Sequence, residues 1–179
     1  MKIDKHLYKG YPKKGEEKRY LVSFENLDFL KLLRNYQVIE LEDCQNTDEI
    51  RTRRVGNQYF RSWEEQEEPI TKEQYEESVK NMYHLYRVVY RTRYIFPDGL
   101  ISSAILSGIK VDSFEGRGVF MMLDTFSTWN GFGILTVKGS NIKDMNLKLP
   151  GIDIVKDITG DKTYYTKSMA TIDYTSFLE

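Results

Sequence analysis

The stretch that decides the fold is IRTRRVGNQYFRSWE, residues 50–64. Two strand-like runs in it are separated by the dipeptide Gly56-Asn57, which is typical of a tight β-hairpin turn. The sequence therefore predicts a hairpin of two strands over Glu49–Val55 and Gln58–Glu64.

Ionisable residues two positions apart recur along other strand-like segments, so each pair shares one strand face. These pairs are Glu17 and Arg19, Arg51 and Arg53, Arg91 and Arg93, and Lys110 and Asp112, with Glu65 and Glu67 just past a strand. The charged face is either a solvated outer surface or the inside of a barrel. Its recurrence over several segments favours the inside. Another such pair, Glu40 and Glu42, is interpreted as a solvent-facing strand edge.

The remaining pattern predicts two helices and further strands. Strands are expected over Lys18–Phe24, Tyr36–Asp43, Val88–Phe96, Leu100–Leu106, Ile109–Phe114, Val119–Phe126 and Gly133–Val137. Asn26 can cap a helix over Leu27–Asn35, and Thr71 with Gln74 forms a capping box before an apolar helix face that extends to Tyr86. We predict an α+β fold, with an antiparallel sheet that is closed or nearly closed and flanking helices.

Length and composition exclude several classes of protein. The chain has 179 residues, enough for one domain with a core, which we place at 17–179 after a loose lead-in at 1–16. Its 26 basic and 27 acidic residues nearly cancel, so neither duplex nucleic acid nor a membrane surface is an expected partner. Cys44 is the single cysteine, and the N-terminus lacks an apolar signal segment, so a cytoplasmic location is expected. The oligomeric state is left open.

An arginine-lined interior suits polyphosphate. Arginine grips phosphate oxygens with paired donors and stays charged at any working pH. Carboxylates beside it would repel the anion unless they hold Mg²⁺ or Mn²⁺. A ligand such as tripolyphosphate or a nucleoside triphosphate is therefore expected. The alternative is a network of Arg–Glu ion pairs with no ligand.

The order of these motifs resembles the CYTH family, the triphosphate tunnel metalloenzymes. The matching segments run from residue 17 to 170: Glu17-Lys18-Arg19, Ile50-Arg51-Thr52-Arg53, Tyr59-Phe60, Glu65 with Glu67 and Ile70, Arg91-Thr92-Arg93-Tyr94, Val111-Asp112-Ser113-Phe114-Glu115-Gly116, and Asp157-Ile158-Thr159-Gly160-Asp161. The resemblance implies an antiparallel β-barrel tunnel. It assigns triphosphate binding to Arg19, Arg51, Arg53, Arg91, Arg93 and Lys110, and metal binding to Glu17, Glu65, Glu67, Asp112 and Asp124.

Several positions depart from the family pattern. Gly15 stands where the first family Glu is expected, Arg19 replaces the family Lys, and Glu64 stands at a later Lys position. Between residues 100 and 140 two alignments compete, in which either Asp112 or Asp124 lies on the acidic strand. The last strand lacks the family's E-x-E pair in both alignments, which predicts a weakened metal site.

Three functions follow from these observations. The first is a metal-dependent triphosphatase, which the resemblance implies and the missing acidic pair weakens. The second is a non-catalytic tunnel that binds a nucleotide or polyphosphate. The third is an interaction module whose charges form salt bridges, and a cyclase acting on ATP is a further, less favoured activity of the family. No catalytic residue is assigned.

Overall fold

The structure is a computed structural model. It describes residues 16–27, 37–64, 66–80, 82, 88–96, 106–107, 120–139, 142, 146–147 and 151–169. The predicted helix over 27–35, the predicted turn at 97–99 and the predicted strand at 109–114 lie wholly or mostly outside these residues. The same holds for most of the strand predicted at 100–106.

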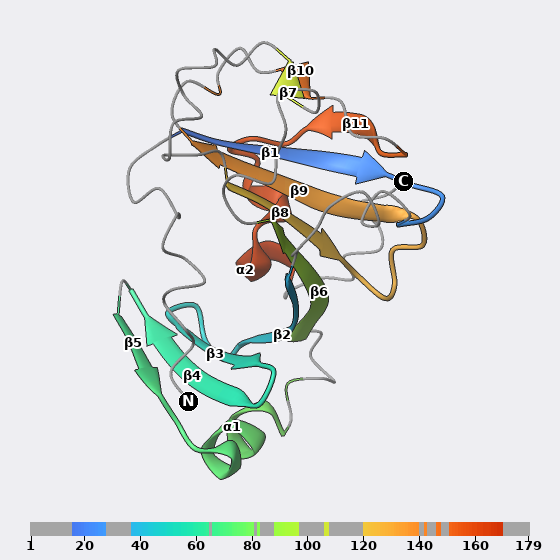
Figure 1. Cartoon of the computed structure of the whole chain (residues 1–179). Coiled ribbons are helices and arrows are strands. Elements are labelled where there is room, and N and C mark those ends of the chain that lie inside the picture. The colour runs from blue at the N-terminus through green and yellow to red at the C-terminus, as the bar shows by residue number, and fades with distance from the viewer. Residues whose placement is uncertain are drawn as a thin grey trace. The chain divides into compact units, whose positions relative to one another are not determined.

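Antiparallel strands make up most of the described chain (Figure 1). They are β1 (Glu16–Ser23), β2 (Gln37–Gln45), β3 (Ile50–Val55), β4 (Gln58–Trp63), β5 (Gln66–Pro69), β6 (Val88–Phe96), β7 (Leu106–Ser107), β8 (Phe120–Thr125), β9 (Phe132–Gly139), β10 (Asn146–Leu147) and β11 (Asp153–Asp157). The helical elements are α1 (Lys72–Val79), the 3₁₀ turn η5 (Lys162–Tyr164) and α2 (Thr166–Met169). The predicted α+β composition is confirmed.

A nine-stranded sheet has the order β11-β1-β9-β8-β6-β2-β3-β4-β5, and β10 pairs with β7 in a second sheet. The strand pairs β1–β11, β1–β9, β8–β9, β2–β3, β3–β4 and β4–β5 are all antiparallel. Within the described residues this order has two ends, β11 and β5, and no pairing joins them. The predicted antiparallel sheet is present, and closure into a barrel stays a prediction.

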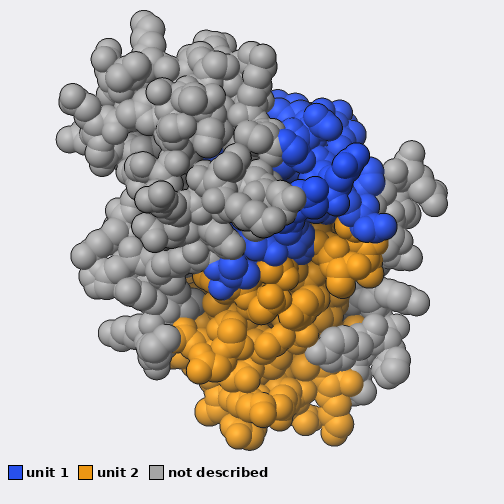
Figure 2. Space-filling view, turned by 45° about the vertical axis from the view of Figure 1, so that its right-hand side comes forward, with its two compact units in different colours: residues 1–38, 93–125, 130–160 blue, residues 39–92, 126–129, 161–179 orange. Residues whose placement is uncertain are grey.

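The chain divides into two compact units (Figure 2). The first unit comprises residues 1–38, 93–125 and 130–160, and the second comprises 39–92, 126–129 and 161–179. Strand β6 passes from the second unit into the first between Thr92 and Arg93.

The core of the first unit is built on β1, β9 and β8. Hydrophobic side chains of these strands are buried on both faces of the sheet: Tyr20, Leu21, Val22, Met121, Met122, Leu123, Ile134, Leu135 and Val137. Gly133 is needed where β8 and β9 approach each other, because a Cβ there would lie 2.7 Å from the backbone oxygen of Asp124. The β1–β9–β8 layer is therefore tightly packed.

The second unit is built on the predicted hairpin. β3 and β4 are joined at Gly56, which has φ +57° and so adopts the left-handed conformation that glycine tolerates. Helix α1 lies beside this hairpin (Figure 1) and packs Tyr75 and Val79 against Cys44. The capping box is confirmed, with Gln74 N donating to Thr71 Oγ1 at 3.1 Å and Thr71 N to Gln74 Oε1 at 2.8 Å.

Three predictions about elements were wrong or incomplete. The acidic segment before Pro69 forms β5, because it pairs with β4 and Glu68 forms an ion pair with Arg61. The C-terminal tail contains β11, which completes its hydrogen bonds along β1. Helix α1 ends at Val79, and Met82 lies in a turn, so the helical spacing of apolar residues continued beyond the described helix.

None of the helices in the described ranges is long and apolar enough to cross a membrane.

Candidate functional site

The second unit has a charged sheet face that follows from the strand register. Asp43 of β2 lies opposite Arg53 of β3, and Gln45 lies opposite Arg51. Because residues two apart share a face, Asp43, Arg51 and Arg53 project from the same side of the sheet. Glu67 of β5 also lies on this side, since it stands opposite Ser62, which in turn is opposite Arg51. Arg51 and Arg53 share a strand face as predicted, and Glu67 lies on the same side of the sheet.

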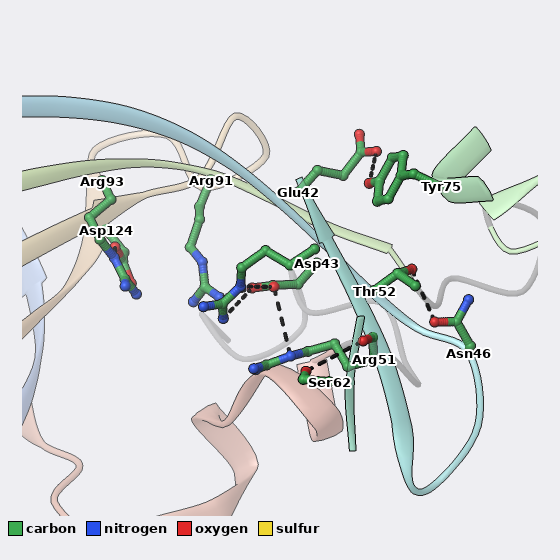
Figure 3. A network of polar contacts seen from close by, with 11 residues as sticks. Glu42, Asp43, Asn46, Arg51, Thr52, Ser62, Tyr75, Arg91, Arg93 and Asp124 are labelled. Atoms are coloured by element: carbon green, nitrogen blue, oxygen red, sulfur yellow. Dashed lines mark hydrogen bonds and ion pairs between the residues drawn. The ribbon is translucent and has the colours of Figure 1, made fainter. Parts of the chain in front are cut away.

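Asp43 is the centre of this face. Arg53 donates to both its carboxylate oxygens, with Nε 2.5 Å from Oδ1 and Nη2 3.3 Å from Oδ2. Arg91 of β6 donates from Nη2 to Oδ2, and Arg51 Nε lies 4.0 Å from Oδ1. Figure 3 shows the side chains of Arg91 and Arg51 directed at Asp43 from different strands. Three guanidinium groups therefore surround one carboxylate.

Burial decreases across the three arginines. The Asp43 side chain is 0% exposed and that of Arg91 is 6% exposed, whereas Arg53 and Arg51 are 21% and 31% exposed. Burial alone would raise the pKa of Asp43, but the charges of Arg53, Arg91 and Arg51 outweigh it and hold the pKa well below its usual range. Asp43 is therefore ionised, and Arg51 is the most accessible of the cations.

The described chain does not satisfy the hydrogen-bonding capacity of the Arg51 guanidinium. Its Nε is buried without a hydrogen-bond partner, and its guanidinium makes no hydrogen bond to the described part of the chain. Burial and the neighbouring charge of Arg53 lower the pKa of Arg51. A buried unsatisfied donor is costly and is rare in folded proteins. An anion beside Arg51 would accept a hydrogen bond from its guanidinium and would place a negative charge next to Arg51 and Arg53.

The opposite face of β2 has a structural role. Glu42 accepts a hydrogen bond from the hydroxyl of Tyr75 on α1 (Figure 3), and Glu40 accepts from the hydroxyl of Tyr90 at 2.7 Å. Thr92 also donates to Glu40, at 3.1 Å. The prediction of a solvent-facing edge for Glu40 and Glu42 was wrong, because β2 lies inside the sheet and α1 packs on this side of it.

The first unit also carries a charged face. Glu17 of β1 lies opposite Lys138 of β9, and its Oε2 is 2.8 Å from Lys138 Nζ. Arg19 lies on the same face, since it is two residues from Glu17. Asp124 of β8 also lies there, because it is opposite Ile134 of β9, which is an even number of residues from Lys138. Arg93 grips Asp124 with two bonds, Nε to Oδ1 at 2.7 Å and Nη2 to Oδ2 at 2.9 Å. Each of these carboxylates therefore has a protein cation as its partner.

The predicted metal ligands do not form a cluster in the described chain. Glu17 and Asp124 are engaged by Lys138 and Arg93, and Glu67 is an exposed residue of β5. Among the described residues, no group of three or more Asp, Glu, His or Cys side chains could hold a metal ion. The remaining predicted site residues, Glu65, Lys110 and Asp112, lie outside the described residues.

Two residues of the charged faces, Asp43 and Lys138, were missed by the sequence interpretation. The sequence interpretation considered Glu40 and Glu42 but not Asp43. Alternation along β2 places Asp43 on the same face as the buried Leu41, which is the face that carries Arg51 and Arg53. Lys138 lies on the last strand, where the sequence showed only that the family's acidic pair is absent. The pairing of β9 with β1, which gives Lys138 a direct partner, is not visible in the sequence.

Comparison with known proteins supports the fold. A crystal structure of the inorganic triphosphatase NE1496 is similar at TM-score 0.58 and 21% identity, over 87% of this chain and 97% of that one. A crystal structure of the hypothetical protein NE1496 is similar at TM-score 0.60 and 21% identity, over 89% of this chain and 99% of that one. No protein-family model and no curated protein matches the sequence. The chain thus shares the fold of a triphosphatase over most of its length.

Proposed function

We propose that the chain binds a triphosphate, either tripolyphosphate or a nucleoside triphosphate, through the arginines around Asp43. The observation that carries the proposal is Arg51, whose guanidinium lies 4.0 Å from Asp43 and makes no hydrogen bond to the described chain. Among the described residues, three guanidinium groups face the single carboxylate of Asp43, with Glu67 at longer range, so their positive charge is only partly balanced there. A polyanion would neutralise the remainder and accept from planar paired donors.

Asp43 has a positioning role in this proposal. It holds Arg53 and Arg91 by direct hydrogen bonds, so their side chains are already ordered before a ligand arrives. Ordering a long side chain on binding costs about 0.5–1.5 kcal/mol, and preorganisation removes that cost. The site is therefore suited to binding, and Arg51, the most accessible of the three arginines, is the residue that a ligand would engage first.

Calorimetry with tripolyphosphate, ATP and inorganic phosphate tests the proposal. The longer anions are expected to bind more tightly because more oxygens are gripped, and affinity should fall with salt. Arg51→Ala should weaken tripolyphosphate binding by about 10–100-fold, the equivalent of about 1.5–3 kcal/mol for a hydrogen bond to a charged group.

Arg61→Ala is the matched control. Arg61 lies in the same unit but on the opposite sheet face, where it pairs with Glu68 through Nε at 2.9 Å, and its loss should leave the affinity unchanged. Equal, undetectable affinity for all three anions would overturn the proposal.

A closed tunnel is the extended form of the proposal. The resemblance also assigns triphosphate binding to Arg19, Arg93 and Lys110. Arg19→Ala should then weaken tripolyphosphate binding as Arg51→Ala does. An effect confined to substitutions of Arg51, Arg53 and Arg91 would limit the site to the second unit.

Hydrolysis of the bound triphosphate is the second candidate activity, favoured by the fold shared with a protein described as an inorganic triphosphatase. The engaged carboxylates favour slow turnover or none. Phosphate release is measured from tripolyphosphate and ATP with Mg²⁺ or Mn²⁺. Turnover above about 1–10 s⁻¹, ordinary for an enzyme, that disappears in Glu67→Gln would establish a metal-dependent triphosphatase. We propose a cytoplasmic location for the chain, where it would meet its triphosphate ligand.

A further inference from the structure

The two described carboxylates that the resemblance assigns to a metal in the first unit, Glu17 and Asp124, are too far apart to share one. Glu17 lies opposite Lys138, and Lys138 lies opposite Phe120, whereas Asp124 is four residues further along β8. Two strand spacings of about 4.8 Å and four residues of about 3.4 Å place the two Cα atoms roughly 16 Å apart. Ligand oxygens bind Mg²⁺ or Ca²⁺ at about 2.0–2.6 Å, so two ligands of one ion lie within about 5 Å of each other.

Each of these carboxylates is also already neutralised. Lys138 Nζ lies 2.8 Å from Glu17 Oε2, and both oxygens of the buried Asp124 accept from Arg93. A divalent ion at Glu17 would have to displace Lys138 and would find no second carboxylate opposite. The described residues of this unit therefore do not fit the family's metal.

We propose that triphosphate binding by this chain does not use a metal ion at Glu17, and that the Lys138 ammonium is the positive charge beside β1 in place of such an ion. Glu17 then acts as a positioning residue for the Lys138 ammonium. A lysine supplies a compact positive charge that needs no coordination shell. Arg19, two residues from Glu17 on the same face, adds a second cation. This inference rests on the proposed triphosphate binding and specifies its electrostatics.

Binding of Mn²⁺ to the full-length protein without phosphate, followed by electron paramagnetic resonance, tests the metal directly. Wild type and Glu17→Gln are expected to bind Mn²⁺ equally, because Glu17 is not a ligand. Lys138→Glu places two carboxylates on directly opposite residues, whose Cβ atoms lie about 4.5–5.5 Å apart. This variant should therefore bind Mn²⁺ at least tenfold more tightly than wild type.

Lys138→Gln is the matched control, since it removes the same ammonium from β9 without adding a carboxylate, and it should bind Mn²⁺ less tightly than Lys138→Glu. Mn²⁺ binding by wild type that Glu17→Gln weakens tenfold or more would overturn the inference. That comparison does not depend on whether Lys138→Glu folds.

Calorimetry with tripolyphosphate supplies a second readout. Affinity in a chelating buffer should equal that with Mg²⁺ within about threefold, after correction for the Mg²⁺–tripolyphosphate complex. A tenfold gain with Mg²⁺ that is lost in Glu17→Gln would overturn the inference while leaving the proposed function intact. Absence of tripolyphosphate binding in both buffers would instead overturn the proposed function, and the Mn²⁺ comparison would still decide whether Glu17 is a metal ligand.

Discussion

The charged faces of the two units use the same residue types in different ratios. In the second unit, Arg51, Arg53 and Arg91 converge on the single carboxylate of Asp43. In the first unit, each carboxylate has its own cation, Arg93 for Asp124 and Lys138 for Glu17. Paired charges satisfy one another, whereas a surplus of guanidinium groups attracts an anion from outside.

The difference shows why alternating charges in a sequence do not by themselves identify a binding site. An Arg-x-Arg strand occurs in both β3 and β6. The two arginines of β6 bind different carboxylates. Arg91 joins the arginines around Asp43, whereas Arg93 forms a bidentate ion pair with Asp124. The neighbouring strand decides the outcome.

Asp43→Asn should have the largest effect on stability. Removing the negative charge leaves three guanidinium groups facing one another in a buried site, and breaking a buried ion pair costs about 3–5 kcal/mol. Asp124→Asn removes the carboxylate partner of a single arginine, Arg93, and should cost less. Urea unfolding measures the free energies of both variants.

Glu68→Gln is the control for this pair of variants. It removes the carboxylate partner of Arg61 in an exposed ion pair, whose loss costs about 0.2–1 kcal/mol. If Asp43→Asn lost no more stability than Glu68→Gln, the three arginines would not be held by Asp43.

Acid should weaken the second unit through the same carboxylate. The pKa of Asp43 is depressed in the folded chain, so its stabilising effect is complete above the unfolded value of about 3.9 and is lost as pH falls towards the folded value. Between pH 5 and pH 2 the wild-type protein should lose about 2 kcal/mol more than Asp43→Asn. Urea unfolding across this range measures the difference, and identical slopes for the two proteins would contradict it.

Gly133→Ala tests how tightly the first unit is packed. The added methyl group would lie 2.7 Å from the backbone oxygen of Asp124, so β8 and β9 would have to separate. Overpacking of this kind costs about 1–3 kcal/mol. Thermal unfolding measures the loss, and an unchanged midpoint would show that the β8–β9 contact adjusts freely.

Thr71→Ala should have a small effect on stability and should separate folding from binding. It removes the side-chain cap of α1, which costs about 1 kcal/mol. Because α1 packs on the sheet face opposite Arg51 and Arg53, the affinity for tripolyphosphate should not change. Thr71→Ser keeps the hydroxyl and should restore stability. A loss of affinity in Thr71→Ala would show that the two faces are coupled.

Local chemistry made much of the fold predictable. The hairpin at Gly56, the capping box at Thr71 and the strand Val88–Phe96 each depend on neighbouring residues, and the structure confirms all three. Strands β5 and β11 were missed because β5 is mostly polar and β11 is exposed, with charged residues at both ends and only Ile154 and Val155 apolar. Their hydrogen bonds to β4 and β1 supply the stability that their side chains lack.

The sequence by itself determined which residues could share a strand face, because side chains alternate along any strand. It thereby placed Arg51 with Arg53, and Glu17 with Arg19. Only the tertiary structure decided which strands are neighbours, and hence which charges meet. Asp43 became the centre of the candidate site because β2 lies between β3 and β6. Pairing across strands depends on contacts distant in sequence, which no local pattern specifies.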